Sequence, residues 1–207
     1  MMDWKANSVT VGAIALLILI MLGSSLMFGS KFQAPKIIYV EEPLTKNSEF
    51  GLVPGEVYRY SVNYGNASGN VTYAILRGQG CVGIRVLESV NSSGTCVKRD
   101  GTDRTGYNST LADPSIMMFK PWMLALGEGW HWNASAYIYY GMKEERVSET
   151  YYRVIRMEDY NGRQSFLVGV RNGDGPEAYE WIDAEKRILM KMSSNGYEIA
   201  LAEEKKA

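Results

Sequence analysis

An uninterrupted apolar segment near the start of the chain contrasts with the alternating pattern that follows it. Residues 9–28 carry no charge, and about 20 residues of helix span the roughly 30 Å hydrocarbon core of a bilayer. The pattern predicts a single transmembrane helix, with residues 1–8 as a short cytoplasmic stub. Residues 29–52 then form a tether, in which Pro35 and Pro43 oppose continued helix.

The same segment also has features of a cleaved leader. Its core from Val11 to Leu22 has the length of a signal-peptide apolar region, and Gly23 to Ser25 supply small residues for cleavage. A pilin-type leader, cut before the apolar segment, has only Lys5 as its basic signal. Because residues 26–28 continue the apolar run, its full length favours an uncleaved anchor.

Short runs with a period of two dominate the chain after Val53. Alternation places successive side chains on opposite faces of a strand, and residues 57–64 show it with Tyr at positions 58, 60 and 64. Asn161-Gly162 and Asn195-Gly196 are typical two-residue hairpin turns. Residues 37–40 are a candidate edge strand, and the predicted strands beyond the tether are 57–64, 71–77, 82–86, 95–99, 130–140, 147–157, 165–168, 178–182, 188–192 and 197–202.

One apolar stretch, residues 115–126, interrupts the strands. Asp113 can cap a helix there and Pro114 fits its first turn, whereas Pro121 breaks or kinks it. The expected fold is therefore mainly β, with a single N-terminal transmembrane helix and a curved antiparallel sheet carrying one short inserted helix. The sheet domain covers residues 53–202, and residues 203–207 form a charged, frayed tail.

The chain has two cysteines, Cys81 and Cys96. An even count in an exported domain indicates a disulfide, which would stabilise by roughly 3 kcal/mol for a loop of about 15 residues. The alternative is two buried free thiols. If residues 92–93 were a hairpin tip, Cys96 would face a residue near Ser89, so the bridge requires a bulge or a longer loop.

Five glycosylation acceptor tripeptides point to a domain outside the cytoplasm, in an archaeal or eukaryotic setting. Asn and Ser are also common in turns, which weakens the inference. The formal net charge of -1 argues against a nucleic-acid or anionic-lipid partner, because such a partner requires a basic face. The chain is expected to be a cell-surface glycoprotein of the membrane. The acceptor asparagines are Asn66, Asn70, Asn91, Asn108 and Asn133.

The residues that enzymes use are sparse. The single histidine, His131, lies between two tryptophans and lacks the spaced partners of a triad or a metal site. Four carboxylates, Glu177, Glu180, Asp183 and Glu185, fall near a predicted hairpin, where solvated turn charges are the simplest interpretation. We therefore expect no catalytic residue, no metal and no cofactor.

An apolar set around the inserted segment has more functional promise. Met-rich surfaces are adaptable, which suits a lipid pocket or a docking face for a partner. The alternative is that these side chains fill the concave face of the sheet as core, as a domain of this size requires. The set comprises Met117, Met118, Phe119, Trp122, Met123, Trp130 and Trp132.

The order of elements resembles the β half-barrel of lipoprotein carriers of the LolA and LppX type. The resemblance is carried by the entry strand at residues 55–60, the insertion through Trp122, Leu124 and Gly127, and the closing run at residues 179–190. It implies a curved sheet around a short apolar helix that can hold an acyl chain. No ligand-binding residue of that family can be placed on this chain, and fold alone does not give function.

Two functional hypotheses follow. The first is a non-enzymatic, membrane-anchored module that binds a protein partner at the cell surface or serves as an accessory subunit. The second is a carrier or sensor of an apolar ligand such as a lipid. Whether the concave face of the sheet is filled or hollow separates them.

Overall fold

A computed structural model describes residues 36–41, 44–87, 94–101, 116–140 and 143–206. The chain divides into two compact units, residues 1–37 with 138–145 and residues 38–137 with 146–207. The predicted anchor, residues 9–28, lies outside the described residues. Within the described ranges, the structure has no helix of the length and apolarity that crossing a membrane requires.

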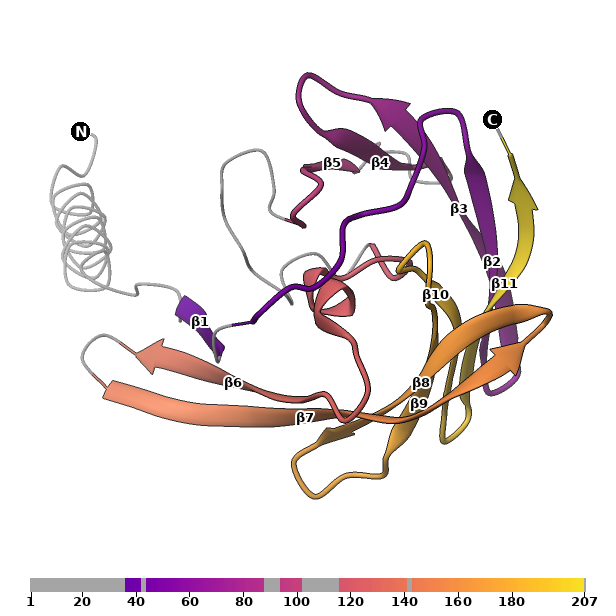
Figure 1. The fold of residues 1–207 in the computed structure, drawn as a ribbon. Coiled ribbons are helices and arrows are strands. Elements are labelled where there is room, and N and C mark those ends of the chain that lie inside the picture. Colours follow the sequence, from indigo (N-terminus) through magenta and orange to yellow (C-terminus); the bar gives the residue numbers. More distant parts are fainter. Residues whose placement is uncertain (1–35, 42–43, 88–93, 102–115, 141–142, 207) are drawn as a thin grey trace, which may run out of the picture. The chain divides into compact units, whose positions relative to one another are not determined.

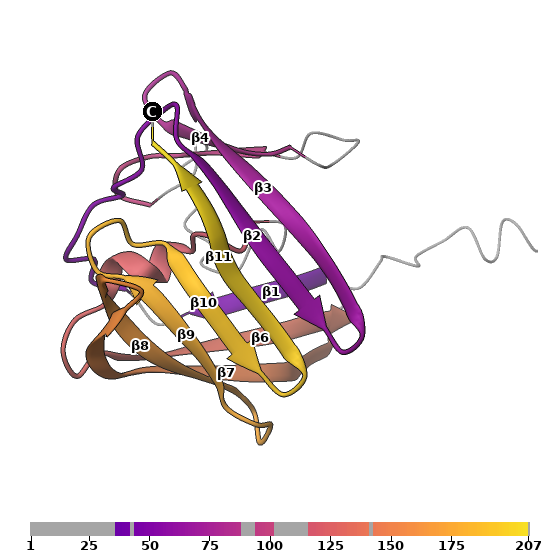
Figure 2. The same ribbon diagram turned by 90° about the vertical axis from the view of Figure 1, so that its right-hand side faces the viewer.

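The described residues form a mainly β structure. Its sheet has the strand order β1-β6-β7-β8-β9-β10-β11-β2-β3-β4-β5, and each pair with a described register is antiparallel. Strands β2, β11, β10, β9 and β8 lie in succession in Figure 2. The strands are β1 (Lys36–Glu41), β2 (Val57–Tyr64), β3 (Ala67–Arg77), β4 (Val82–Val86), β5 (Gly94–Val97), β6 (His131–Tyr140), β7 (Lys143–Tyr160), β8 (Arg163–Asn172), β9 (Ala178–Asp183), β10 (Leu189–Ser194) and β11 (Tyr197–Lys205).

The predicted hairpins at both Asn-Gly pairs are confirmed. Tyr160 pairs with Arg163 across Asn161-Gly162, and both turn residues have positive φ, as a type I′ turn requires. Ser194 pairs with Tyr197 across the second Asn-Gly turn. Local turn chemistry therefore fixes the register of β7–β8 and of β10–β11.

Several element boundaries differ from the sequence prediction, and three of these differences concern the β2–β3 turn, β7 and β11. The turn between β2 and β3 is only two residues long, because Tyr64 pairs with Ala67. Strand β7 has 18 residues and begins before the predicted position 147. Its first residues are charged, so they show no apolar alternation from which a strand could be predicted. Strand β11 extends to Lys205, so residues 203–205 pair with β2 instead of fraying as a tail.

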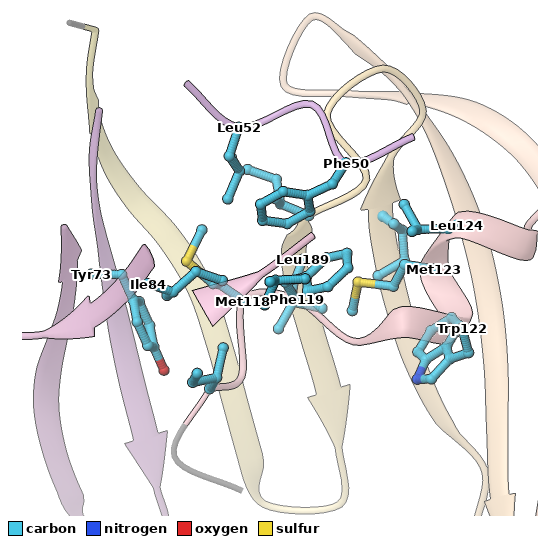
Figure 3. Packing of buried hydrophobic residues seen from close by; sticks show 14 of the residues in the cluster. Phe50, Leu52, Tyr73, Ile84, Met118, Phe119, Trp122, Met123, Leu124 and Leu189 are labelled. Carbon is cyan, nitrogen blue, oxygen red and sulfur yellow. The ribbon is translucent and has the colours of Figure 1, made fainter. Parts of the chain in front are cut away.

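The inserted segment, residues 116–126, lies on the concave side of the curved sheet (Figure 1). Its only helix is the 3-10 helix η1 (Pro121–Ala125), which Pro121 begins instead of kinking, since proline suits a first helical position. Met118, Phe119 and Trp122 pack with Phe50 and Leu189 in one buried cluster (Figure 3). The concave side of the described sheet is thus filled along this segment.

Candidate functional site

Backbone carbonyls at the end of the inserted segment are held from two directions. The Arg187 Nη1 group donates to the carbonyls of Met123 at 3.4 Å and Leu126 at 3.0 Å. On the other side, the Ser48 hydroxyl donates to Leu124 O at 2.9 Å, and the Asn47 amide reaches the carbonyls of residues 125 and 126. A 3-10 helix leaves its last carbonyls unpaired, so these donors act as its C-terminal cap.

Arg187 reaches the segment from the turn that follows β9. The Asp183 carboxylate accepts hydrogen bonds from the backbone amides of Glu185 and Lys186, each at 2.8 Å. Arg187 itself adopts φ 59°, a left-handed conformation that is rare for a non-glycine residue. Its guanidinium lies 4.8 Å from the ring centre of Phe166. The turn is therefore shaped to send Arg187 into the interior.

The neighbouring residue, Lys186, is the centre of a charge cluster on the other side of this turn. Its ammonium lies 2.6 Å from Glu56 Oε1 and 2.8 Å from Glu204 Oε1, and it also donates to the Tyr58 hydroxyl at 2.8 Å. Arg163 continues the cluster by pairing with Asp183 and with the second oxygen of Glu204. We call these six residues the Lys186 cluster.

Electrostatics favour the charged forms of the Lys186 cluster. Burial, the largest single effect, would raise the pKa of the Glu56 and Glu204 carboxyls. The hydrogen bonds from Lys186, added to those from Val53 and Tyr58 on Glu56 and from Arg163 on Glu204, together lower the pKa of both. Burial likewise opposes the charge on Lys186, but its bonds to Glu204 and Glu56 raise its pKa. The ion pairs and hydrogen bonds of the cluster connect the start of β2, the end of β9 and the end of β11, and they stabilise this arrangement.

The sequence interpretation of the acidic residues near this turn was wrong for two of them. Glu185 is exposed, as a solvated turn charge should be, and Glu177 pairs with Arg153 at 3.0 Å. Glu180 and Asp183, however, are buried. Asp183 is buried because it organises the turn, whereas Glu180 lies on the concave face of β9 together with Ile182.

Glu180 is an ionisable group in apolar surroundings. Its side chain is 8% exposed, and it pairs across the sheet with Val168 and Met192. In the described part of the chain its carboxylate has no hydrogen bond. Burial raises its pKa and the charge of Lys120 in the inserted segment partly offsets this rise, so that the pKa is about 7.

An apolar hollow of about 310 Å³ lies beside the inserted segment, at the hairpin that joins β2 and β3. Val62, Tyr64, Gly69, Val71 and Met117 are among the residues that line it, and Tyr64 has 69% of its surface exposed. A Cβ built on Gly69 would meet no atom within 4 Å, so this part of the hollow is open. Its size is at the lower end of the range of small-molecule sites.

Most of the predicted apolar set belongs to the core. Met118, Phe119, Trp122, Met123 and Trp132 are each 4% exposed or less, so they present no surface to a partner. All five belong to the buried hydrophobic cluster of the core, and the Trp122 ring stacks on Trp130 with 5.9 Å between the ring centres. Met117 and Trp130 are partly exposed, and Met117 alone of the set lines the hollow.

His131 begins β6 and is exposed. Its Nδ1 lies 3.4 Å from the carbonyl of Gly129, a contact within its own turn. No group of His, Cys, Asp and Glu side chains suited to a metal ion occurs among the described residues.

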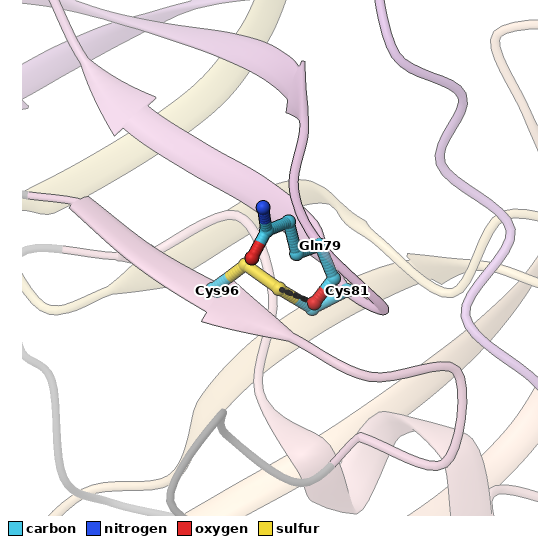
Figure 4. Close-up of a disulfide and its surroundings, with 3 residues drawn as sticks. All are labelled: Gln79, Cys81 and Cys96. Carbon is cyan, nitrogen blue, oxygen red and sulfur yellow. Dashed lines mark hydrogen bonds between the residues drawn. A yellow bond between two sulfur atoms is a disulfide. The ribbon is translucent and has the colours of Figure 1, made fainter.

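The predicted cysteine pair is brought to disulfide distance. Cys81 and Cys96 are joined in the structure, with their Cα atoms 5.5 Å apart (Figure 4). The register pairs Gly83 with Cys96 and Arg85 with Gly94, and residues 87–93 separate the two strands in the sequence. Cys81, just before β4, therefore lies diagonally opposite Cys96.

The acceptor asparagines can be placed in part. Asn66 in the β2–β3 turn and Asn70 on β3 are exposed, and Asn133 on β6 is partly exposed. Asn91 and Asn108 lie outside the described residues. Modification of any of the five stays a prediction.

Comparisons of the chain with protein-family models, with curated proteins and with solved structures find no match. The function must therefore be argued from the site and the surface alone.

Proposed function

We propose that this chain is a non-enzymatic binding module, held at the membrane by residues 9–28 and presenting its sheet domain to a protein partner at the cell surface. The observation that carries the proposal is the filling of the concave side by the inserted segment, with Trp122 and Leu124 each 2% exposed or less. A domain whose interior is packed in this way has its outer surfaces available for recognition.

Apolar side chains on the outer face of β7 to β9 support this proposal. Trp181 pairs with Leu167, and Tyr179 with Gly169, on the face opposite to Glu180. Tyr179 is 39% exposed and Ile155, on β7, is 37% exposed. Exposed apolar residues grouped among charged ones are common at protein interaction sites.

The remaining parts of the proposal concern location. The uncharged length of residues 9–28 supports a single-pass anchor with a cytoplasmic N-terminus. The disulfide and the five acceptor asparagines support an oxidising, extracytoplasmic setting and a glycosylated domain. The proposed archaeal origin is based on the same combination of an anchor and acceptor sites.

Site-specific photo-crosslinking in native membranes tests the module. A benzophenone amino acid is introduced at Tyr179 or Ile155 of the full chain, and at Tyr64 beside the hollow as a matched exposed position. The proposal expects one discrete adduct from the outer-face positions and none from Tyr64. An absence of adducts at both outer-face positions, or equal adducts at all three, would overturn it.

The hollow favours a second function, the carriage or sensing of an apolar ligand by a half-barrel of the lipoprotein-carrier kind. Its lining by Val62, Val71 and Met117 suits hydrocarbon better than any polar group. The Tyr197 hydroxyl donates to Sδ of Met117, one of the lining residues, at 3.8 Å. The ligand class is a lipid chain or a similar apolar molecule.

Binding of a fluorescent polyene fatty acid to the full chain tests this second function. Gly69→Leu places an apolar side chain in open space within the hollow and is expected to weaken binding at least about tenfold, a loss of about 1.4 kcal/mol. Asn63→Leu, an exposed neighbour on β2 outside the hollow, is the control and should bind as the parent chain does. Undiminished binding by the Gly69 variant would place any ligand elsewhere.

A further inference from the structure

The outer face of β3, β4 and β5 carries a row of residues with little side-chain bulk. Ile84 on β4 is buried in the core, so the positions next to it on that strand face outward. One outward row runs across the three strands through Leu76, Gly83 and Cys96. Because Gly83 has no side chain, the backbone of β4 is uncovered in the middle of this row.

The next outward row contains a second glycine. In it Arg85 pairs with Gly94 of β5. A Cβ on Gly94 would lie 2.9 Å from the carbonyl oxygen of Ile84, and one on Gly83 would lie 3.3 Å from Cβ of Leu76, so a larger residue would crowd its neighbours at either position. Glycine within a strand often marks a place where a ligand or another backbone approaches closely.

Both rows line a hollow of about 280 Å³. Leu76, which is 38% exposed, supplies an apolar contact surface, and Arg85 supplies a guanidinium. Thr95 and Cys96, one half of the disulfide, are also among the lining residues. The size of the hollow, just below the usual range of small-molecule sites, suits a compact ligand.

The guanidinium of Arg85 is available to such a ligand. Arg85 is exposed, it is the one charged residue in this lining, and it has no hydrogen bond or ion pair with another residue of the described ranges. Arg59, Arg153 and Arg163, by contrast, are each paired with a carboxylate of the chain. The planar fork of an arginine matches the two oxygens of a carboxylate.

We propose that this hollow binds a small carboxylic acid with a short apolar arm, its carboxylate paired with Arg85 and its arm against Leu76. One guanidinium balances the single charge of a carboxylate, whereas a phosphate monoester carries about -1.5 to -2 at pH 7 and requires a further cation. A free acid and the carboxyl terminus of a peptide share this chemistry. The site has no lining residue in common with the hollow beside the inserted segment.

Two-dimensional NMR of the isotope-labelled full chain in detergent micelles tests the site, with the amide signals of Gly83 and Gly94 as reporters. Isocaproate is the probe, and it should shift both signals saturably with a dissociation constant on the order of 1 mM. Isocaproamide, the uncharged analogue, should bind at least about fivefold more weakly. Acetyl-Gly-Gly-Leu with a free carboxyl terminus separates the two sources. Tighter binding than isocaproate identifies a peptide terminus, and weaker binding identifies a free acid.

Three variants assign the binding to the two side chains. Arg85→Met removes the cation at an exposed position and should weaken isocaproate binding at least about fivefold with the fold intact. Leu76→Ser should weaken it about threefold or more through the lost apolar contact. Arg77→Met, an exposed arginine on β3 outside the lining, is the matched control and should bind as the parent chain does.

The proposal fails if isocaproate leaves the Gly83 and Gly94 signals in place, or if isocaproamide binds as well as the acid. It also fails if Arg85→Met or Leu76→Ser binds isocaproate as the parent chain does. A loss in Arg77→Met equal to that in Arg85→Met would show attraction to positive charge in general and would overturn the site as well.

Discussion

The ammonium of Lys186 lies 2.6 Å from the carboxylate of Glu56, a residue 130 positions earlier in the chain. The contact joins the turn after β9 to the residue that precedes β2, two places separated along the sheet by β10 and β11. Glu204 at the end of β11 shares the same ammonium. One cation therefore links three places in the second unit: the residue before β2, the turn after β9 and the end of β11.

Removal of that cation should be costly. Lys186→Met leaves Glu56 and part of Glu204 ionised and buried without their counter-charge, and we expect the free energy of unfolding to fall by about 3 kcal/mol. Lys205→Met, which breaks only the exposed pair with Glu203, is the control and should cost no more than about 0.5 kcal/mol. Urea titration of the full chain in micelles measures both. Equal losses would show that the Lys186 cluster adds no stability.

The same cluster should make the protein sensitive to acid. Because the folded-state pKa values of Glu56 and Glu204 lie below their ordinary value, the unfolded chain binds protons first as the pH falls. The stability that these carboxylates contribute is thus present above about pH 4.5 and lost below it, at up to about 1.4 kcal/mol per pH unit for each. Unfolding curves between pH 3 and 6 should show a shallower loss for Lys186→Met than for the parent chain. A parallel decline would assign the acid sensitivity to other groups.

Arg187 should matter mainly to the inserted segment. Arg187→Met removes the donors to the carbonyls of Met123 and Leu126, and we expect a loss of about 2 kcal/mol. Exchange protection of residues 116–126 should decrease more than that of β8. Arg85→Met, an exposed arginine on β4, should change the free energy of unfolding by less than about 0.5 kcal/mol. Uniform loss of protection across the sheet would contradict a local role for Arg187.

The disulfide should be detectable through Gly78. A Cβ at this position would lie 2.5 Å from Cys96 Sγ and 2.8 Å from Cys81 Sγ, so Gly78→Ala should cost about 2 kcal/mol. The cost should largely disappear when both cysteines are replaced by alanine, a change that itself costs about 3 kcal/mol. Gly69→Ala, whose Cβ meets nothing, is the matched control. If Gly78→Ala costs the same in both backgrounds, the clash lies elsewhere.

Local signals predicted the strands well and the interior poorly. The two Asn-Gly turns and the alternation of residues 57–64 depend on neighbours in the sequence, and the structure reproduces them. The inside position of Glu180 could have been inferred, since it shares its parity with Ile182 and not with Trp181. The charge of Glu180 favours a solvated turn position, and the sequence interpretation followed the charge instead of the alternation; the side chain is buried.

Long-range partners lay beyond such reasoning. The contact of Lys186 with Glu56 depends on the pairing of β11 with β2, which no local pattern specifies. Three charges in a row at Glu203 to Lys205 predict an exposed tail, whereas Glu204 pairs with Arg163 and Lys186. The count of two cysteines predicts that Cys81 pairs with Cys96. The register of β4 and β5, which brings the two residues together, could not be predicted from the sequence.

The insertion of β11 between β10 and β2 has a consequence for how the protein is made. Strands β2 to β5 and strands β7 to β10 emerge as separate ladders, and each must wait with an open edge until residues 197–205 arrive to bridge them. Open edges of this kind attract other chains. Biogenesis of this protein therefore places its greatest demand for chaperoning on the interval before that final strand is delivered.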